Sequence, residues 1–594
     1  MSEMIPILSL VMLVLLPLLL SFALMFRSTR AMAIHLAPWA ALPVFVQVVF
    51  APPSDSLHLP WLLLDTTLGI GDDTSRLFLL FTSLLWSLAG VFARSYMAKN
   101  PQRPSFYLYF LLAMCGNLGL ILAQDMASFY VFFALMSFAS YGLVAHERTR
   151  EAMRASSIYM ILVVIGELAL FAAMVMAMVE TDAIDFETVR AGLPQAASLD
   201  QIILLALIGF GIKAGVLGLH MWLPLAHPVA PTPASAVLSG AMIKAGLLGW
   251  LRLLPLGETA LLQWGEVFML LGLAAAFYGV VVGLTQRNPK TVLAYSSISQ
   301  MGIITIAVGL GLSAPSAYPL ILTVITLYAL HHGLNKGALF LGVGVIAACH
   351  GRLRQWVWWL LWLPALALAG APLTSGMLVK TMFKAQITNA PDHWITLLPL
   401  LLSISSIATA LLLGRFLVLL AKPKSKHSTT EHVMPMGLIL PWAMLIITAI
   451  ALPWWLAPSS FMTLSLTMIL SSLWPVLLAV AIIVVTLWII KRRPSTATPI
   501  DEGPMAFGKS LHIPPGDLLI PISYVSTRLF NASRYLCMTQ LPRWRDIWLA
   551  KLKRPWPNIL LLLQRLDRIE TKLTRWHIGL LIFVLLSLVL VWFS

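Results

Sequence analysis

Long apolar segments recur along the whole chain, and each is about as long as a bilayer is thick. A helix needs roughly 20 apolar residues to cross a hydrocarbon core of about 30 Å, and the chain has room for about 16 such segments. They lie near residues 4–26, 31–52, 77–96, 106–123, 126–145, 156–178, 201–219, 236–255, 262–285, 291–312, 317–349, 355–385, 395–421, 434–456, 470–490 and 576–593. Only 11% of the residues are charged, against about 25% in soluble proteins. We therefore predict an all-α polytopic membrane protein, which excludes a soluble enzyme.

The basic residues follow a positional pattern, which decides what the net charge of +15 means. Loops after odd-numbered segments carry Arg27, Arg30, Lys99, Arg103, Arg148, Arg287, Lys290, Arg352 and Lys422. Loops after even-numbered segments carry acidic residues instead, as at 72–73 and 180–187. Because basic loops mark the cytoplasmic side, the pattern predicts both termini outside a bacterial-type inner membrane. The positive charge then reflects topology, and we expect no nucleic-acid partner.

The two ends of the chain call for separate predictions. The stretch 4–26 has neither a basic region before it nor a small-residue cleavage site, so we expect a retained helix rather than a signal peptide. Residues 491–575 contain several prolines, which exclude one continuous helix, yet two stretches have apolar residues at helical spacing with charges opposite. This pattern predicts an amphipathic lateral arm on the cytoplasmic side, followed by a final helix at 576–594. A loosely ordered surface segment is the alternative.

Cysteine spacing bears on cofactors. Cys115, Cys349 and Cys537 lie far apart in sequence, and the chain has no CxxC pair. A cysteine-held iron–sulfur cluster or zinc ribbon is therefore not expected. We predict no cofactor, no metal site and no catalytic residue within this chain.

Ionisable residues inside the apolar segments are the candidates for function, because a charge near the middle of a bilayer is costly and is usually retained for a task. The candidates are Glu167, Lys213, Lys244, His331, His332, Lys336 and Lys380. Lys384 and Arg415 also lie in apolar segments, but there we expect side chains that reach toward a segment end. A buried lysine beside an acid can gain or lose a proton near neutral pH, and histidines can relay it. The set predicts a hydrated proton path across the protein.

Helix-breaking residues lie near two of these lysines. Pro224, Pro228 and Pro231 follow Lys213, and Pro372 with Gly376 precedes Lys380. We expect the helix to be interrupted at both places, although prolines can also serve packing alone. Irregular backbone at membrane depth is tolerated only beside protein or a watery cavity. Two broken, lysine-bearing segments five apart predict two five-helix repeats of inverted topology.

Four motifs resemble one protein family. The run HMWLPLAHPVAPTPASAVLSGAMIKAGLLGWLR is similar to the signature of the antiporter-like subunits of respiratory complex I, membrane-bound hydrogenases, formate hydrogenlyase and Mrp antiporters. NPKTVLAYSSISQMG resembles the family's DxKxxxAYSSxxxxG stretch, with Asn288 in place of Asp. HHGLNKGALFL and APLTSGMLVK resemble two further helices, with Met377 where Phe is usual. The resemblance covers roughly residues 60 to 420.

The resemblance implies a bundle of core helices with two inverted repeats, acting as one proton-translocating module of a larger assembly. The expected divisions are 1–105 for the first three helices, 106–255 and 256–421 for the two repeats, 422–490 for two further helices, 491–575 for the arm and 576–594 for the final helix. By match, Lys213 and Lys244 take the lysine positions of the first repeat. His332, Lys336 and Lys380 take those of the second.

One departure from the family concerns the helix at 126–145. Relatives usually carry a glutamate there that pairs with the lysine of the broken helix, whereas this chain has Ala134. Without that carboxylate, burial favours the neutral form of Lys213 unless another acid compensates. Glu167, one helix further on, is the nearest candidate. An inactive first half-path, or one that moves another species, is the alternative.

Two classes of function follow. The leading one is a cofactor-free, proton-translocating subunit of a redox-driven membrane complex, whose partners are other membrane subunits and peripheral redox subunits in the lipid bilayer. The other is a non-redox transport component, either of an Mrp-type sodium/proton antiporter or of an inorganic-carbon uptake complex. A purely structural spacer is disfavoured, because a spacer could replace Lys244, Lys336 and Lys380 by apolar residues and gain stability.

Overall fold

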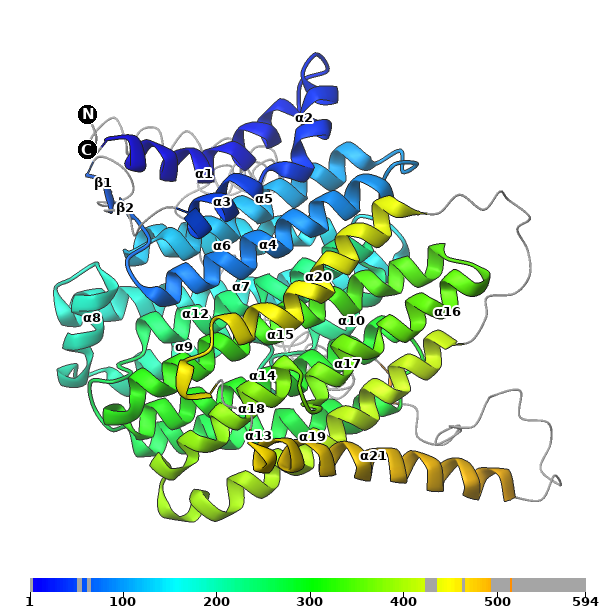
Figure 1. Ribbon diagram of the computed structural model, residues 1–594. Helices are drawn as coiled ribbons and strands as arrows, with labels where there is room; N and C mark the ends of the chain where they lie inside the picture. Colours follow the sequence, from blue (N-terminus) through cyan, green and yellow to red (C-terminus); the bar gives the residue numbers. More distant parts are fainter. Residues whose placement is uncertain are drawn as a thin grey trace, which may run out of the picture. The chain divides into compact units, whose positions relative to one another are not determined.

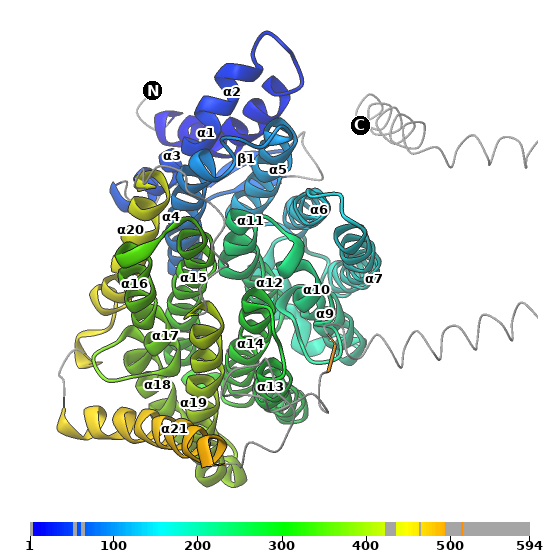
Figure 2. The same ribbon diagram turned by 90° about the vertical axis from the view of Figure 1, so that its right-hand side faces the viewer.

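The computed structural model describes residues 4–50, 56–60, 66–421, 435–461, 465–492 and 513–514. Its helices are α1 (Met4–Ala23), α2 (Arg30–Leu36), α3 (Leu42–Phe50), α4 (Asp73–Tyr96), α5 (Arg103–Leu122), α6 (Met126–Val144), α7 (Arg150–Thr181), α8 (Phe186–Gly192), α9 (Leu199–Ala214), α10 (Trp222–Val229), α11 (Thr232–Val237), α12 (Lys244–Leu253), α13 (Leu262–Leu284), α14 (Pro289–Ser313), α15 (Tyr318–Ala348), α16 (Gly351–Leu360), α17 (Trp362–Ala369), α18 (Ser375–Gln386), α19 (Asp392–Ala421), α20 (Met436–Trp455) and α21 (Leu466–Arg492). Most of them run side by side in a bundle (Figure 1). In both views α1 to α3 lie at one edge of this bundle and α21 lies at the opposite edge (Figure 2).

Within the described residues, 12 helices are long and apolar enough to cross a membrane. The other segments predicted in this part of the chain correspond to α1 and to the broken helices at 201–219 and 355–385. The polytopic, mainly helical class is confirmed, while the count of about 16 and the inverted repeats stay predictions. The predicted arm and the final helix lie outside the described residues, apart from 491–492 and 513–514.

A small antiparallel hairpin between α3 and α4 was not expected from the sequence. Strand β1 (Leu57–Leu59) pairs with β2 (Thr66–Leu68), with Leu57 opposite Leu68. The backbone N–H of Thr67 donates to the Asp125 carboxylate over 2.8 Å, which ties the hairpin to the start of α6. Three-residue strands are too short to show a period-two pattern in an apolar sequence.

Two spans form the centre of the bundle. Every residue is buried in the apolar windows of Thr232–Leu253, which contains α11 and α12, and of Pro289–Ser313, which is α14. α14 packs closely on α13, because a Cβ added to Gly272 would lie 2.5 Å from the carbonyl oxygen of Gly302. A helix surrounded by other helices has no lipid-facing side, so its polar residues can face protein. The lysines and hydroxyls of these two spans therefore lie among other protein groups.

The first helix break begins earlier than the prolines predict. α9 ends at Ala214, and Gly215 follows in the left-handed conformation with φ of +80°. Pro224 and Pro228 lie within the short helix α10, and Pro231 is the N-cap of α11. The expectation that these prolines end the lysine-bearing helix is corrected: glycine ends it, because glycine adopts positive φ without a steric penalty. The prolines shape the two short helices that follow.

The second break lies between α17 and α18. Gly370 ends α17 with φ of +86°, and Thr374 caps α18 by accepting a hydrogen bond from the Met377 N–H. Pro372 lies in the connection between the two helices. Gly376, predicted as part of the break, is instead the second residue of α18. A Cβ there would collide with the carbonyl oxygen of Ala367, so Gly376 allows the two half-helices to approach closely.

Candidate functional site

Lys213 lies in the last turn of α9 and is buried. Its ammonium group donates hydrogen bonds to the Ser137 hydroxyl over 3.2 Å and to the Tyr159 hydroxyl over 2.9 Å. The Tyr159 hydroxyl in turn donates to the Ser137 carbonyl oxygen over 2.9 Å. The Lys213 nitrogen also lies 5.4 Å from the centre of the Tyr159 ring. Ser137 of α6 and Tyr159 of α7 thus hold the ammonium group between two helices.

Glu167 is the acid nearest to this lysine. It is buried on α7, eight residues and about two turns after Tyr159, and it interacts electrostatically with Lys213. Neither carboxylate oxygen makes a hydrogen bond of good geometry with a described residue. Ala134, where relatives carry glutamate, lies one turn before Ser137 on α6. The negative charge of this cluster therefore comes from α7, and a hydroxyl holds the lysine on α6. The name first cluster is used below for Lys213, Ser137, Tyr159 and Glu167.

Lys244 begins α12, directly after a π-helical turn at Leu238–Met242. Its ammonium group donates to the Ser239 carbonyl oxygen over 2.6 Å, within that turn. A π turn widens the helix and leaves backbone groups without their usual partners, which a buried lysine can satisfy. The Ser239 hydroxyl lies 2.7 Å from the Ser297 hydroxyl of α14. Hydroxyl groups of the π-helical turn and of α14 therefore meet beside the Lys244 ammonium group.

Lys336 lies in the middle of α15 with none of its surface exposed. It donates to the Leu293 carbonyl oxygen over 3.0 Å and interacts electrostatically with Lys244. Within the described residues, Lys244 and Lys336 both donate to backbone carbonyl oxygens. Two neighbouring ammonium groups without a carboxylate repel each other, so both cannot easily remain charged at once.

His331 and His332 lie between these lysines and Lys380. His331 shares a hydrogen bond with the Ser375 hydroxyl of α18, 2.9 Å away, and interacts electrostatically with Lys244 and Lys380. His332 is fully buried, and both of its ring nitrogens lack a hydrogen-bond partner among the described residues. Imidazoles without a protein partner in a buried site need a movable partner such as water. The histidines therefore connect the central lysines to α18.

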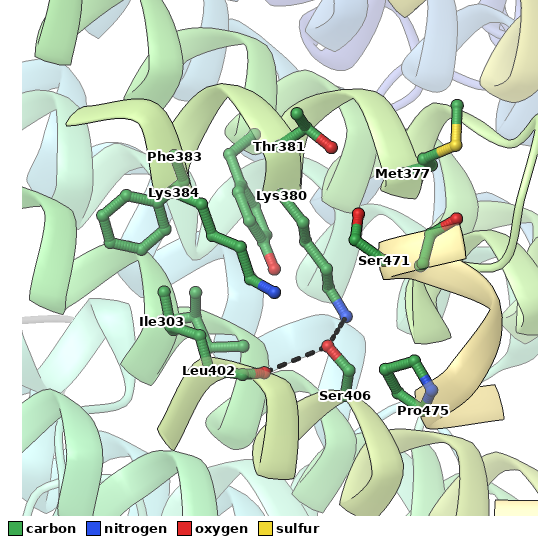
Figure 3. A pocket seen from close by; sticks show the side chains of 13 residues that line it. Ile303, Met377, Lys380, Thr381, Phe383, Lys384, Leu402, Ser406, Ser471 and Pro475 are labelled. Atoms are coloured by element: carbon green, nitrogen blue, oxygen red, sulfur yellow. Dashed lines mark hydrogen bonds between the residues drawn. The ribbon is translucent and has the colours of Figure 1, made fainter. Parts of the chain in front are cut away.

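Lys380 and Lys384 lie one turn apart on α18 and line one cavity (Figure 3). Lys380 donates to the Ala369 carbonyl oxygen over 2.9 Å and to the Ser406 hydroxyl over 3.0 Å. Lys384 donates to the Ser403 hydroxyl over 2.9 Å. Lys384 lies half-buried in the last turn of α18, and the expectation that it reaches toward a segment end stays a prediction. Arg415 is half-buried and donates to the Gln286 carbonyl oxygen over 3.3 Å.

Sequence reasoning missed His227 and Lys290. His227 of α10 is fully buried, stacks on Phe340 with ring centres 4.5 Å apart and interacts electrostatically with Lys290 and Lys336. Neither of its ring nitrogens has a hydrogen-bond partner among the described residues. Lys290, at the start of α14, donates to the Ala230 carbonyl oxygen over 2.7 Å, inside the first helix break. Both residues stand in the quoted motifs, so the motifs were the available signal. Tyr159 and Ser137, which hold Lys213, lie outside the quoted motifs.

The predicted site residues thus fall into two groups. Lys244, Lys336, His331, His332 and Lys380 are connected to one another by electrostatic interactions, whereas Lys213 and Glu167 interact with each other. No such interaction joins Lys213 to Lys244 in the described part of the chain. The residues that the structure describes contain no group of three or more His, Cys, Asp or Glu that could hold a metal ion.

Comparison with protein families gives a match over residues 123–406, to the family described as NADH:quinone oxidoreductase/Mrp antiporter, TM. Component B of hydrogenase-4 from Escherichia coli (strain K12) is 33% identical over 307 residues, which are 50% of this chain and 44% of that protein. A Staphylococcus saprophyticus protein named antiporter subunit mnhA2 is 32% identical over 411 residues, 62% of this chain and 50% of that protein. The matches thus span about half the length of these relatives.

Two solved structures share the fold. The Mrp complex from Dietzia sp. DQ12-45-1b contains a chain that matches 96% of this chain and 63% of its own length, with a TM-score of 0.67 at 19% identity. The membrane-bound sulfane sulfur reductase, an archaeal respiratory membrane complex, contains one that matches 80% of this chain and 99% of its own length, with a TM-score of 0.62 at 20% identity. Both helix breaks and all the buried lysines described above lie within the matched residues 123–406. The residues that are similar to the NADH:quinone oxidoreductase/Mrp antiporter family are therefore those that contain both helix breaks and the buried lysines.

Proposed function

We propose that this chain is a proton-translocating, antiporter-like subunit of a multi-subunit, redox-driven membrane complex. The observation that carries the proposal is the connected set of buried lysines and histidines in the centre of the bundle. Lys244 and Lys336 are fully or almost fully buried, and replacing such residues by apolar ones would stabilise a mere spacer. Their retention is best explained by a function in which the lysines are protonated and deprotonated in turn.

The proposed path has a definite order. From the side of the basic loops, a proton would pass Lys290 and His227 at the first break and reach Lys336 and Lys244 in the centre. It would then pass His332 and His331 to Lys380 on α18. Each neighbouring step is supported by an electrostatic interaction or a shared hydrogen bond, and the unpartnered ring nitrogens of His227 and His332 offer positions for relaying water.

The first cluster would act as a separate loading site. A proton held by Lys213 is stabilised by Glu167 and by the two hydroxyl oxygens that accept its hydrogen bonds. Movement of α7 relative to α9 would change the separation of the two charges and thereby load or release the proton. In this proposal Glu167 takes the part that a glutamate at position 134 would take in relatives.

Partners and orientation belong to the same proposal. The E. coli relative is named as a hydrogenase component, and one structural neighbour is a respiratory membrane complex. We infer that this chain assembles with other membrane subunits and peripheral redox subunits in an inner membrane, with both predicted termini outside. A sodium/proton antiporter is the second candidate, favoured by the match to a protein named as an antiporter subunit and by the Mrp complex neighbour.

One experiment separates the two candidates. The complex is purified through a tag on this chain, its partners are identified by mass spectrometry, and it is reconstituted in vesicles with an entrapped pH-sensitive dye. Iron–sulfur or nickel-bearing partners with redox-driven proton movement support the pump, whereas proton movement driven by an imposed sodium gradient supports the antiporter. Lys244→Ala and Lys380→Ala should each abolish proton movement without loss of assembly. Wild-type movement in either variant contradicts the proposed path.

A further inference from the structure

The cavity beside α18 carries two ammonium groups and little else that is charged. Lys380 and Lys384 are four residues apart, so their side chains lie on one face of α18. Both extend into the same space, with Ser406 of α19 below them and Ser471 and Pro475 of α21 beside them (Figure 3). None of the described residues that line this cavity is an Asp or a Glu. Among the described residues, the cavity therefore concentrates positive charge without a carboxylate to balance it.

The two ammonium groups in the cavity have more N–H donors than hydrogen bonds to the described residues. Each ammonium group has three N–H donors. Lys380 uses two of them, on Ala369 and Ser406, and Lys384 uses one, on Ser403. The remaining N–H donors of both lysines have no protein acceptor in the described residues. They require an acceptor that the protein itself does not supply.

The serine hydroxyl groups in and beside the cavity cannot act as further donors without breaking other bonds. The Ser403 hydroxyl donates to the Pro399 carbonyl oxygen over 2.8 Å, and the Ser406 hydroxyl donates to the Leu402 carbonyl oxygen over 3.0 Å. The hydroxyls of Ser471 and Ser472 likewise donate within α21. The donors that remain for a bound group are therefore the ammonium groups and the Thr381 hydroxyl. The ammonium groups favour a negatively charged acceptor.

The first cluster shows what this cavity lacks. There a single buried lysine has a carboxylate, Glu167, close enough for an electrostatic interaction. Two ammonium groups in one cavity repel each other, and a buried charge without a partner is costly. The space beside Lys380 is about 30 Å³, enough for one or two groups of the size of water. A counter-charge that fits it must be small.

We propose that this cavity binds one small inorganic anion of halide size, held between the ammonium groups of Lys380 and Lys384. The anion supplies the counter-charge that Glu167 supplies in the first cluster, so that both lysines can be protonated together. The proposal shares Lys380 with the proposed proton path, but anion binding does not depend on proton movement. It assigns a ligand, and not only a proton, to the α18 side of the molecule.

The test uses the full chain, purified in detergent, with thermal unfolding as the readout. Sodium chloride or sodium bromide replaces sodium gluconate, whose anion is too large for the cavity, at constant ionic strength and pH. We expect a saturable rise of the unfolding midpoint by a few degrees, because a ligand that binds only the folded state stabilises it. Lys384→Gln should lose the rise, while Lys99→Gln, a change at an exposed lysine of a basic loop, should keep it. Equal rises in both variants, or none in the wild type, overturn the proposal.

Two additions keep the result decisive. If Lys384→Gln does not fold, Ser403→Ala replaces it, since it frees the Lys384 ammonium without removing the charge and should change the halide concentration at half-effect. Bromide located between the two Nζ atoms by anomalous diffraction supports the proposal, and a saturable rise with bicarbonate but not with halides overturns the halide-size assignment. Loss of proton movement in Lys380→Ala, together with no halide effect on the wild-type unfolding midpoint, leaves the proton path standing and sinks the anion site. A halide effect on the wild-type midpoint, together with normal proton movement in Lys380→Ala, does the reverse.

Discussion

The first cluster and the α18 cavity both place ammonium groups beside serine hydroxyls, but they differ in how the charge is balanced. In the first cluster one lysine lies near one carboxylate, and a tyrosine and a serine orient the ammonium group. In the α18 cavity the two lysines donate to separate hydroxyl and carbonyl oxygens, and no acid lines the space in the described residues. A carboxylate fixed in the fold gives a constant counter-charge, whereas the cavity must gain its counter-charge from outside or give up a proton.

The backbone beside Lys213 also differs from the backbone beside Lys380, in how closely it is packed. Lys213 precedes a glycine that simply ends its helix, while Lys380 follows a tight junction in which α17 and α18 nearly touch. The first site can therefore adjust by movement of whole helices, and the second is held rigidly at its backbone. Four measurements test these differences between the two sites.

The largest effect is expected at the junction of α17 and α18. In Gly376→Ala the new Cβ meets the Ala367 carbonyl oxygen, a backbone atom that cannot turn away, so we expect about 3 kcal/mol of destabilisation or failed assembly. Gly166→Ala is the matched change near the first cluster. Its Cβ lies 3.3 Å from the Gly209 carbonyl oxygen and should cost about 1 kcal/mol or less. Thermal unfolding in detergent compares the two, and equal midpoints would contradict the proposed rigid junction.

Removal of the carboxylate tests charge balance in the first cluster. Glu167→Gln keeps the shape but leaves Lys213 without a negative charge, and we expect proton movement to fall about tenfold, which corresponds to about 1.4 kcal/mol. Glu180→Gln is the control, since this exposed residue of the same helix accepts hydrogen bonds from Ala197 and Ser198 that a glutamine oxygen can also accept. The dye assay in reconstituted vesicles gives both rates. Unchanged movement in Glu167→Gln would place the functional acid elsewhere.

Loss of one hydroxyl should have a smaller effect. Tyr159→Phe removes an acceptor of the Lys213 ammonium and the donor to the Ser137 carbonyl, so we expect a few-fold loss, consistent with about 1 kcal/mol for one buried hydrogen bond. Tyr109→Phe serves as the control, because that ring packs beside Gly142 and not beside the lysine. Equal rates in the two variants, measured at equal assembly, would show that Tyr159 does not orient the lysine.

The smallest effect is expected when a carboxylate is restored on α6. Ala134→Glu by itself should change proton movement by less than about threefold, since Glu167 already balances one charge. In the double variant Ala134→Glu with Glu167→Gln, the α6 carboxylate should recover part of the lost movement, because position 134 lies one turn from Ser137. A double variant no better than Glu167→Gln would mean that a carboxylate at position 134 does not reach Lys213.

Several features of the site could be predicted from the sequence. A lysine in the middle of an apolar segment is visible in the sequence, and so is a proline-containing motif beside it. Lys213, Lys244, Lys336 and Lys380 could be identified for this reason. The places of the helix breaks were predicted only coarsely, because proline is visible in sequence whereas the left-handed conformation of Gly215 and Gly370 depends on what surrounds them. The partner of Lys384 could not be predicted for the same reason, because Ser403 lies 19 residues away along the chain.

A bundle of membrane helices that contain basic residues could be predicted without the structure, since the length and apolar character of a segment are local properties that determine whether it can span a bilayer. Which groups meet depends on how the helices pack. Glu167 lies near Lys213 because α7 packs on α9, and Lys380 shares a cavity with Lys384 because α19 and α21 close it. Contacts of this kind join residues on different helices, and their geometry follows from packing that no single segment encodes.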